Sequence, residues 1–255
     1  MRLESFSEHT MVCFVNSFHT FTSADPNESA CERGKRKGVV VASGQVRTRQ
    51  HVNPLSEHMQ KPVELEQEWP KNKFESLERS FHVDVGVAKG RFLFDMAEKN
   101  PDKNFLGLEI RKPLVDQANN WRDDRNLRNL DFIFCNANVS LDEVLSRLPA
   151  GMLDTISVQF PDPWFKKRHQ KRRVLQPELV EVIAKHLKPS GILYVISDVL
   201  EVAEQMDEVV SENPLFRDST PNAWIGENPF NVLTEREKAC INHQRDVHGK
   251  VYTRA

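Results

Sequence analysis

Residues 81–90, which read Phe81-His-Val-Asp-Val-Gly-Val-Ala-Lys-Gly90, decide how the rest of the chain is interpreted. The first five are mostly apolar or β-branched, as in a buried strand, and the glycines that follow favour a tight turn. The residues through about Asn100 predict a helix, whose apolar face is supplied by Phe92, Leu93, Phe94, Met96 and Ala97. This stretch therefore predicts a strand, a glycine turn and a helix in direct succession.

The same strand-then-helix order repeats toward the C-terminus. Further strands are predicted over residues 104–109, 131–135, 153–160 and 192–197, and helices over 141–148 and 177–187. Pro113 suits the first turn of another helix, where its missing N–H is not needed. Strands that alternate with helices predict an α/β fold with a doubly wound, mostly parallel sheet.

A polar residue stands at or near the carboxyl end of each predicted strand. These residues are Asp84, Glu109, Asn136, Asp162 and Asp198, and the first four are 25, 27 and 26 residues apart. Each one alone is as well explained as a helix N-cap or a surface residue. Because ligands of open α/β sheets bind outside the carboxyl ends of the strands, the set predicts one crevice lined by all five.

The stretch from Ser157 to Arg173 combines an acid, an aromatic residue and a cationic loop. Pro161 and Pro163 end the preceding strand and fix the backbone around Asp162. Trp164 follows, as a stacking surface for a base or as an ordinary core aromatic, and six of the next eight residues after Phe165 are Lys or Arg. A solvated basic loop explains such a run by itself, but its place beside a strand-end carboxylate favours a site for a polyanion. We expect five cations of this loop to bind phosphates of the polyanion: Lys167, Arg168, Lys171, Arg172 and Arg173.

Length and composition set the limits of these predictions. The 255 residues carry a net charge of −2, so affinity for nucleic acid must come from local clusters of cations. The four cysteines are far apart and form no C-x-x-C pair, which predicts neither a disulfide framework nor a metal site. No apolar run approaches the roughly 20 residues that cross a bilayer, so no membrane partner is expected.

The N-terminal third divides into two parts. Residues 1–50 lack a hydrophobic period and predict a flexible, disordered tail, whose basic cluster at 33–37 also suits a nuclear signal or an RNA-contacting arm. Residues 51–80 carry three prolines and are expected to wrap around the domain formed by residues 81–255. The acids of the tail argue against a clean organellar transit peptide. The sequence does not choose between the cytoplasm and the chloroplast stroma.

The turn at residues 84–90 favours one cofactor class. The dinucleotide motif G-x-G-x-x-G does not fit, because Arg91 stands where its third glycine allows close packing of helix and strand. Asp84-x-Gly86-x-x-x-Gly90 instead matches the looser turn of S-adenosylmethionine enzymes, with Ala88 in place of a glycine. Glu109 is placed to hydrogen-bond ribose hydroxyls, and the Asn136 amide suits an adenine edge. The absence of a G-x-x-x-x-G-K-[ST] loop gives no support to nucleotide hydrolysis.

Together these motifs resemble the tRNA (guanine-N7)-methyltransferase family, in its single-chain bacterial and plastid form. The most specific match is Phe160-Pro-Asp-Pro-Trp164 with its basic follower, and the others are residues 84–90, 106–110, 136–137, 197–198 and 234–237. The resemblance implies a Rossmann-like methyltransferase fold, S-adenosyl-L-methionine as cofactor and tRNA as substrate. It also implies a monomer or homodimer that needs no partner protein. Ala88 and the C-terminal residues 242–254 depart from the family pattern.

The resemblance also assigns roles to residues. It implies that Asp162 is the active-site acid and that the cofactor is held by Asp84, Gly86, Glu109, Asn136 and Ala137. The substrate would be contacted by Lys166, Asp198, Thr234 and Glu237. Without the family, Thr234-x-x-Glu237 is interpreted as a capping box at the start of a helix.

The implied reaction needs no general base, because guanine N7 has a free lone pair and no proton. We therefore expect Asp162 to orient the base by accepting hydrogen bonds from its N1–H and exocyclic amine. Two alternatives remain open at this point. One is an RNA-binding module on the same fold without turnover, and the other is a methyltransferase for a protein or a small molecule.

Overall fold

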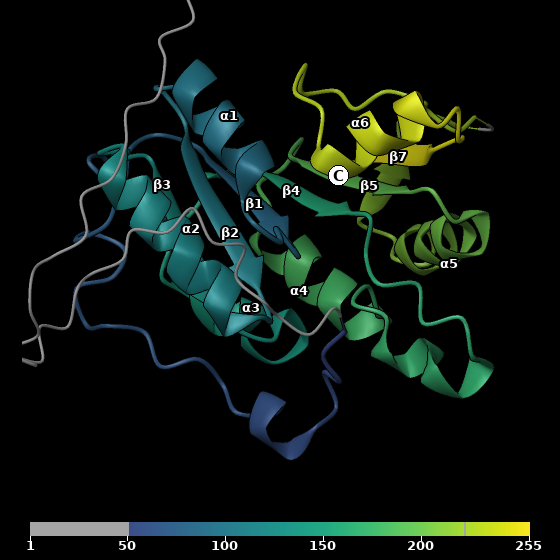
Figure 1. Cartoon of the computed structure of the whole chain (residues 1–255), viewed down its shortest axis with the longest axis horizontal. Helices are drawn as coiled ribbons and strands as arrows, with labels where there is room; N and C mark the ends of the chain where they lie inside the picture. The colour runs from purple at the N-terminus through teal and green to yellow at the C-terminus, as the bar shows by residue number, and fades with distance from the viewer. Residues whose placement is uncertain (1–50, 222) are drawn as a thin grey trace, which may run out of the picture. The chain divides into compact units, whose positions relative to one another are not determined.

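A seven-stranded sheet with the strand order β3-β2-β1-β4-β5-β7-β6 organises the part of the chain that the structure describes, residues 51–221 and 223–255 (Figure 1). The structure is a computed structural model. The parallel strands are β1 (Phe81–Val85), β2 (Asn104–Glu109), β3 (Leu130–Phe134), β4 (Leu153–Gln159) and β5 (Ile192–Ser197). The short β6 (Phe216–Asp218) and β7 (His248–Arg254) complete the sheet, and β7 runs antiparallel to both neighbours. The predicted tail, residues 1–50, lies outside the described residues.

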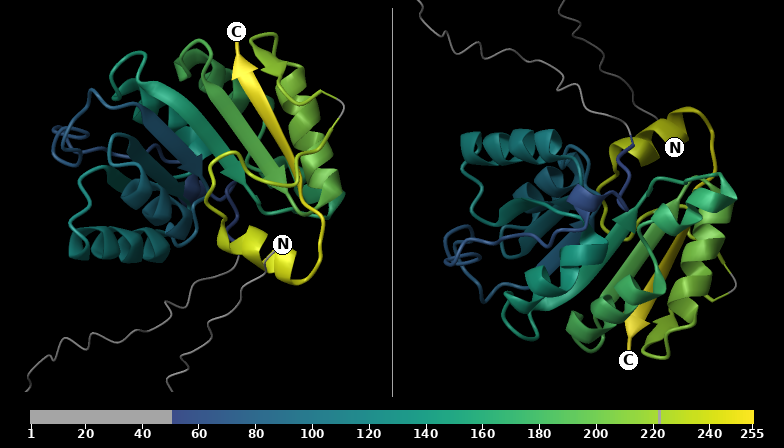
Figure 2. Two further views of the ribbon diagram at one scale, coloured as in Figure 1. Left: turned by 90° about the horizontal axis from the view of Figure 1, so that it is seen from above. Right: turned by 90° about the horizontal axis from the view of Figure 1, so that it is seen from below.

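Among the described residues, five helices, α1 to α5, cover the two faces of this sheet (Figure 2). Phe105 and Phe132 pack in one apolar cluster with α1 (Arg91–Lys99) and α2 (Lys112–Asp124). The next residues along the same strands, Leu106 and Ile133, pack in a second cluster with α3 (Ala137–Ser146), α4 (Pro177–His186) and α5 (Leu200–Ser211). Because successive strand residues point to opposite faces, the two clusters lie on opposite sides of the sheet. The predicted doubly wound α/β fold is confirmed.

Of the elements whose ranges the sequence predicted, most lie within one or two residues of the prediction, and the largest difference is in α3. Helix α5 and strand β6 were not predicted. Helix α3 begins at Ala137, four residues before the predicted start at Leu141. The reason is its cap, since the Asn136 side-chain Oδ1 accepts a hydrogen bond from the Asn138 N–H at 3.2 Å. The cap places the N-terminus of α3 directly after β3, at the edge where the polar strand ends meet.

Of the C-terminal residues that depart from the family pattern, 248–254 form β7, which pairs with the whole length of β5. Tyr252 is fully buried, and its hydroxyl donates to the Asp207 Oδ1 of α5 at 2.5 Å. The Lys250 Nζ lies 2.5 Å from the Asp218 Oδ2 of β6. In Figure 2 the yellow β7 runs opposite to the green β5. This strand therefore completes the sheet in spite of its polar sequence.

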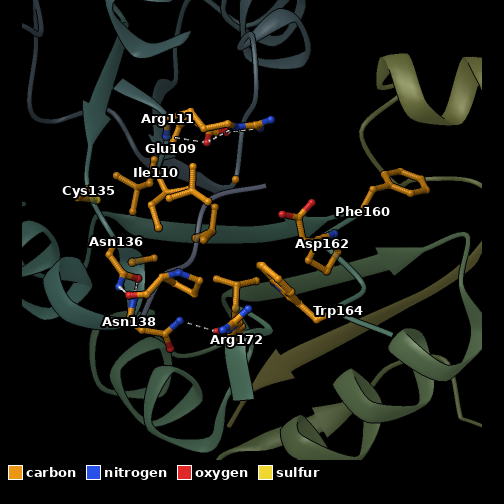
Figure 3. A pocket seen from close by; sticks show the side chains of 18 residues that line it. Glu109, Ile110, Arg111, Cys135, Asn136, Asn138, Phe160, Asp162, Trp164 and Arg172 are labelled. Atoms are coloured by element: carbon orange, nitrogen blue, oxygen red, sulfur yellow. Dashed lines mark hydrogen bonds and ion pairs between the residues drawn. The ribbon is translucent and has the colours of Figure 1, made fainter. Parts of the chain in front are cut away.

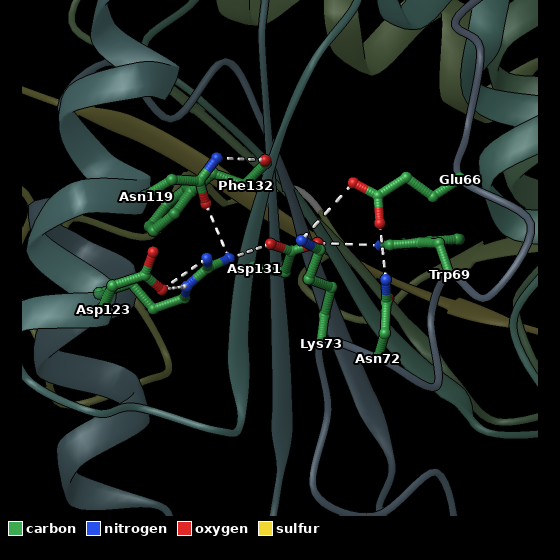
Figure 4. A network of polar contacts seen from close by, with 9 residues as sticks. Glu66, Trp69, Asn72, Lys73, Asn119, Asp123, Asp131 and Phe132 are labelled. Carbon is green, nitrogen blue, oxygen red and sulfur yellow. Dashed lines mark hydrogen bonds and ion pairs between the residues drawn. The ribbon is translucent and has the colours of Figure 1, made fainter.

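The lead-in segment packs against the second apolar cluster and the amino end of β3. Trp69 and Phe74 are buried there, and the Trp69 indole N–H donates to the Asp131 Oδ2 at 2.8 Å. The other carboxylate oxygen of Asp131 pairs with the Arg122 guanidinium (Figure 4). Asp131 is the second residue of β3, so this polar network lies at the end of the sheet opposite to the polar strand ends.

The described residues contain neither a membrane-spanning helix nor a cluster of metal-binding side chains. Among their helices, none has both the length and the apolar character that a membrane crossing requires. The same residues contain no group of three or more His, Cys, Asp or Glu side chains arranged to hold a metal ion.

Candidate active site

Two adjoining clefts open at the carboxyl ends of β1, β2 and β4 (Figure 3 shows the first). The first cleft is lined by Glu109, Cys135, Asn136 and Ala137, and the second by Asp84, Gln159, Asp198 and Thr234. Both clefts share five residues: Gly86, Arg111, Phe160, Pro161 and Asp162. The five polar strand ends that the sequence singled out therefore meet around one site, and Asp162 stands where its two halves join.

Asp84 is the most buried carboxylate of the second cleft, at 4% exposure. Its Oδ1 accepts hydrogen bonds from the Ser157 hydroxyl at 2.6 Å and from the Gln159 Nε2 at 3.1 Å. Burial raises the pKa of Asp84 to about 6, although these two hydrogen bonds lower it. The carboxyl therefore lies close to its ionisation point near neutral pH and favours a cationic partner.

Behind Asp84 lies a buried histidine. The His82 Nε2 is 2.8 Å from the Ser157 Oγ. Burial lowers the pKa of His82 to about 3, so its imidazole is neutral. The Ser157 hydroxyl donates its hydrogen bond to Asp84, so its oxygen is left to accept from the Nε2–H of His82. This pairing assigns the Nε2-protonated tautomer to His82. The chain of donors runs from His82 through Ser157 to Asp84 and fixes the orientation of the carboxylate.

Gln159 is a site residue that the sequence reasoning missed. It is 8% exposed, and its Oε1 is a buried acceptor with no hydrogen-bond donor among the described residues. The assignment of its amide follows from Asp84, since the Nε2 must face the carboxylate oxygen. The available signal was a polar side chain at the carboxyl end of the predicted strand, directly before Phe160. An unmatched buried acceptor in a cleft indicates a missing donor.

The turn after β1 has three residues with positive φ: Gly86 at 90°, Ala88 at 51° and Gly90 at 70°. Ala88 adopts the left-handed conformation in spite of its Cβ, so the turn forms without the middle glycine. At Gly86 a Cβ would meet nothing within 4 Å, which shows open space above the turn. At Gly90 a Cβ would lie 2.5 Å from the Phe132 ring, so glycine is needed there for helix packing.

Glu109 clamps this turn from the end of β2. Its Oε2 accepts from the Ala88 N–H at 2.8 Å, and Arg111 binds both carboxylate oxygens through Nε at 2.8 Å and Nη2 at 2.9 Å. The bonds from Arg111 to Glu109 raise the pKa of the guanidinium. In this structure Arg111 therefore covers Glu109, the residue predicted to bind the ribose. The Arg111 side chain must move before the Glu109 carboxylate can accept hydrogen bonds from ribose hydroxyls.

Asn136 has a different set of contacts from the one we expected. Its Nδ2 donates to the carbonyl oxygens of Pro54 and Met59, both at 3.1 Å, while its Oδ1 caps α3. The segment 51–60 thus lies against the first cleft, which Val52 and Pro54 help to line. The amide hydrogens are already used, so this structure does not offer them to an adenine edge. Ala137, the first residue of α3, does line the first cleft.

Asp162 is exposed and has a histidine beside it. The His51 Nδ1 lies 3.0 Å from the Asp162 Oδ2, and the His51 ring lies 5.8 Å from the Trp164 ring. Phe160 and Trp164, which flank the Pro-Asp-Pro sequence, have φ of 49° and 42°. Positive φ is a genuine outlier for a bulky residue, and such strain concentrates at functional sites. The backbone thus directs Asp162 into the junction of the two clefts.

The basic loop after Asp162 divides into exposed and structural cations. Lys166, Lys167, Arg168 and Lys171 are exposed. Arg172 instead stacks on Trp164, with its Cζ 4.9 Å from the ring centroid. Arg173 is 3% exposed and binds the Pro163 carbonyl at 2.9 Å and the Glu201 carboxylate at 2.7 Å. The expectation that Arg173 grips phosphate is wrong, because its guanidinium holds the loop to α5.

The Thr234 to Glu237 segment forms a complete capping box at the start of α6 (Glu235–Asn242). Glu237 is 2% exposed, accepts from the Thr234 N–H at 2.7 Å, and takes two bonds of 2.8 Å from the Asn228 amide. Its carboxylate therefore faces away from solvent. Thr234 lines the second cleft, and Arg236 reaches Asp198 at 2.5 Å across the same cleft. This pair connects α6 to the end of β5.

The strand order with an antiparallel β7, the glycine turn and the acid at the end of β2 define an S-adenosylmethionine-dependent methyltransferase. Residues 78–249 match a family model described as "Putative methyltransferase". The chain is 46% identical over 209 residues to the tRNA (guanine-N(7)-)-methyltransferase of Trichormus variabilis, covering 82% of this chain and 96% of the relative. It is 48% identical over 211 residues to the enzyme of the same name from Synechococcus elongatus, covering 82% and 97%. The chain belongs to the tRNA (guanine-N7)-methyltransferase family.

A solved structure supports the fold alone. The aminoglycoside resistance methyltransferase NpmB1 is 16% identical, with a TM-score of 0.50 over 76% of this chain and 95% of that one. At this level of sequence identity the likeness concerns the fold and assigns no site residue.

Proposed function

We propose that this chain transfers a methyl group from S-adenosylmethionine to N7 of a guanosine in tRNA. The observation that carries the proposal is the position of the Asp162 carboxylate, which lines both the first and the second cleft. A cofactor that spans both clefts and a base that enters the second cleft would meet beside this carboxylate.

The residues present fit the cofactor. Its α-ammonium needs acceptors, and the second cleft holds the Asp84 carboxylate together with the unmatched Gln159 Oε1. Its adenosine needs an apolar slot with a ribose acceptor, and the first cleft is lined by Leu108, Glu109, Ile110, Cys135 and Ala137. The open space above Gly86 joins these two regions. When bound, S-adenosylmethionine supplies an electrophilic methyl group on a sulfonium centre.

The residues of this chain act by binding and orienting. Asp84 and Gln159 would hold the ammonium, and Glu109 would accept from the ribose hydroxyls once Arg111 is displaced. Asp162 would accept hydrogen bonds from the N1–H and the exocyclic amine of guanine, which turns N7 away from the carboxylate and toward the methyl group. The same negative charge stabilises the positive charge that develops on the ring. No proton is removed before the attack, because N7 carries none.

Roles for the outer residues follow from their positions. Lys166 stands exposed at the start of the basic loop, where it can reach a phosphate near Asp162. Asp198 and Thr234 line the second cleft, where the base would enter. We assign Glu237 a positioning role instead of a contact, because its carboxylate is occupied by Thr234 and Asn228.

The test is incubation with methyl-labelled S-adenosylmethionine and bulk tRNA, followed by nucleoside analysis. Label in 7-methylguanosine is expected, and it should disappear in the Asp162→Ala variant. Tight tRNA binding without a labelled nucleoside would favour the RNA-binding module. Label in protein or in small molecules without label in tRNA would favour the remaining alternative.

We infer that one chain, as a monomer or homodimer, suffices for this activity without a partner protein. The first cleft, the second cleft and the basic loop are all formed by residues of the same chain. Light scattering of the purified active protein measures the oligomeric state. Activity that appears only after adding a cell extract would contradict this inference. The activity belongs in a compartment that contains tRNA, as the cytoplasm and the chloroplast stroma both do.

A further inference from the structure

Phe165 presents a large aromatic ring to solvent beside the active-site acid. It is 67% exposed, which is the largest exposed fraction among the large apolar side chains of the described residues. Phe165 lines the second cleft together with Asp162. An aromatic ring in this position, held at the mouth of a cleft, offers a flat apolar surface to whatever enters.

Trp164, the neighbouring aromatic residue, is already in contact with other groups. Arg172 covers its ring at 4.9 Å, and the rings of His51 and His169 lie 5.8 Å and 5.9 Å from it. Trp164 lines the first cleft, as Figure 3 shows beside Arg172, whereas Phe165 lines the second. The positive φ of 42° at Trp164 turns the backbone between them. Two adjacent aromatic residues thus serve different clefts.

The other groups of the second cleft suit the edge of a purine. Asp162 and the Asp198–Arg236 pair are polar, and Thr234 adds a hydroxyl. These groups can hydrogen-bond a base in its plane, and the planar guanidinium among them, that of Arg236, is already engaged by the Asp198 carboxylate. Of the phenylalanines that line this cleft, Phe92 is buried and Phe160 is partly buried, whereas Phe165 is exposed. The exposed ring of His51 also lines the cleft, but it is paired with Asp162. A nucleobase removed from its stack needs both kinds of contact.

We propose that Phe165 is the stacking surface for the target guanine, and that Trp164 is not. The inference rests on the proposed function. Methylation at N7 leaves a positive charge on the purine, and an aromatic face attracts a cationic ring more strongly than a neutral one. Stacking on Phe165 therefore favours the transition state over the neutral guanine and contributes to turnover as well as to binding.

The test compares Phe165→Leu, which keeps apolar volume without a ring, with Phe165→Tyr, which keeps the ring. We expect kcat/KM for tRNA to fall about 5- to 150-fold in the Leu variant, the range of base stacking on aromatic residues, and to stay within about threefold in the Tyr variant. The affinity for S-adenosylhomocysteine and the thermal midpoint should not change in either variant. Leu215→Ala, at another exposed apolar residue, is the matched control and should keep full activity.

A second readout separates stacking from a general surface effect. Wild type should bind tRNA that already carries 7-methylguanosine more tightly than unmodified tRNA, and Phe165→Leu should lose this preference. Equal kcat/KM in wild type and Phe165→Leu, or equal losses in the Leu and Tyr variants, would overturn the proposal. If wild type itself forms no 7-methylguanosine, the proposed function fails instead, so the two failures are distinguishable.

Discussion

The carboxyl group of Asp84 shows how one buried residue can be prepared for a cationic ligand. Its Oδ1 is saturated by Ser157 and Gln159, and His82 holds Ser157 from behind. Burial raises the pKa of Asp84 from 3.8 to about 6. The folded protein therefore binds a proton more tightly than the unfolded chain does. Protonated Asp84 therefore contributes to the free energy of unfolding, and this contribution is complete below about pH 4. It is lost as the pH rises through 6, which lowers the free energy of unfolding by about 3 kcal/mol in the absence of ligand.

This pKa predicts the pH dependence of cofactor binding. The ammonium of S-adenosylhomocysteine pairs with the ionised carboxylate, so affinity should rise about tenfold between pH 5 and pH 7 as Asp84 loses its proton. Calorimetry at several pH values measures this change. Glu109 and Glu237 act electrostatically on Asp84 and raise its pKa further. A His51→Gln background removes the imidazole beside Asp162.

The control variants for this prediction are Asp84→Asn and Asp102→Asn. The first should bind weakly without pH dependence, and the second, at an exposed acid before β2, should behave as wild type. A rise in affinity that persists in Asp84→Asn would assign the titrating group elsewhere.

Asp162→Asn tests the orienting role of the active-site acid. The amide keeps the volume but replaces one acceptor by a donor that faces the N1–H of guanine. We expect turnover to fall about 10- to 150-fold, the range for loss of a charged hydrogen bond, with unchanged thermal midpoint and cofactor affinity. Single-turnover kinetics at saturating tRNA measures the loss. Rates equal to wild type would exclude the role.

At the scale of elements, the basic loop contains two groups of cations, one expected to bind tRNA and one that holds the loop in place. Changing Lys167, Arg168 and Lys171 to Gln should weaken tRNA binding and reduce the slope of log affinity against log salt by about 2 to 3. Cofactor affinity should not change, because the exposed cations lie outside both clefts. Arg173→Gln is the contrasting variant, since its guanidinium is buried against Pro163 and Glu201.

Arg173→Gln should lower the thermal midpoint, whereas the triple variant should not. A triple variant with an unchanged salt slope and unchanged tRNA affinity would show that the loop is only a solvated surface. A destabilised triple variant would show that the division into exposed and structural cations is wrong.

The elements also show which parts of the fold were predictable. Strands β1 and β2 are buried on both faces, so they appear in the sequence as short, largely apolar runs between turns. The three-residue edge strand β6 and its polar neighbour β7 carry no such run. The site was predictable where strands end, because topology brings those ends together. Contacts such as His51 with Asp162 were not, because they join distant segments without a local pattern.

Two side chains, those of Arg111 and Asn136, show why local sequence patterns did not predict all the contacts of the site residues. Arg111 binds the Glu109 carboxylate, although no sequence pattern assigned Arg111 a role. Asn136 was selected for its strand-end position, and it does cap α3, but its amide holds the segment 51–60. In both cases the partner depends on how loops fold back over the site, which a sequence period does not encode.

At the scale of the whole molecule, the two ends of the sheet serve different purposes. The carboxyl ends of the strands hold the clefts, and the amino end of β3 holds the polar network that attaches the lead-in segment (Figure 4). Burial raises the pKa of Asp131, while Arg122 and Trp69 act in the opposite direction. This carboxylate is therefore tolerated only together with its partners.

Trp69→Phe tests whether this network is independent of catalysis. Phenylalanine keeps most of the buried surface but leaves the Asp131 Oδ2 without its donor, which should cost about 1–3 kcal/mol of unfolding free energy. For a domain of this size the thermal midpoint should fall by about 2–4 °C per kcal/mol. Trp121→Phe in α2 is the matched control, because no hydrogen bond of its indole joins it to the described residues. Cofactor affinity and turnover at 25 °C should equal those of wild type in both variants. A loss of activity in Trp69→Phe alone would mean that the lead-in segment transmits its packing to the clefts.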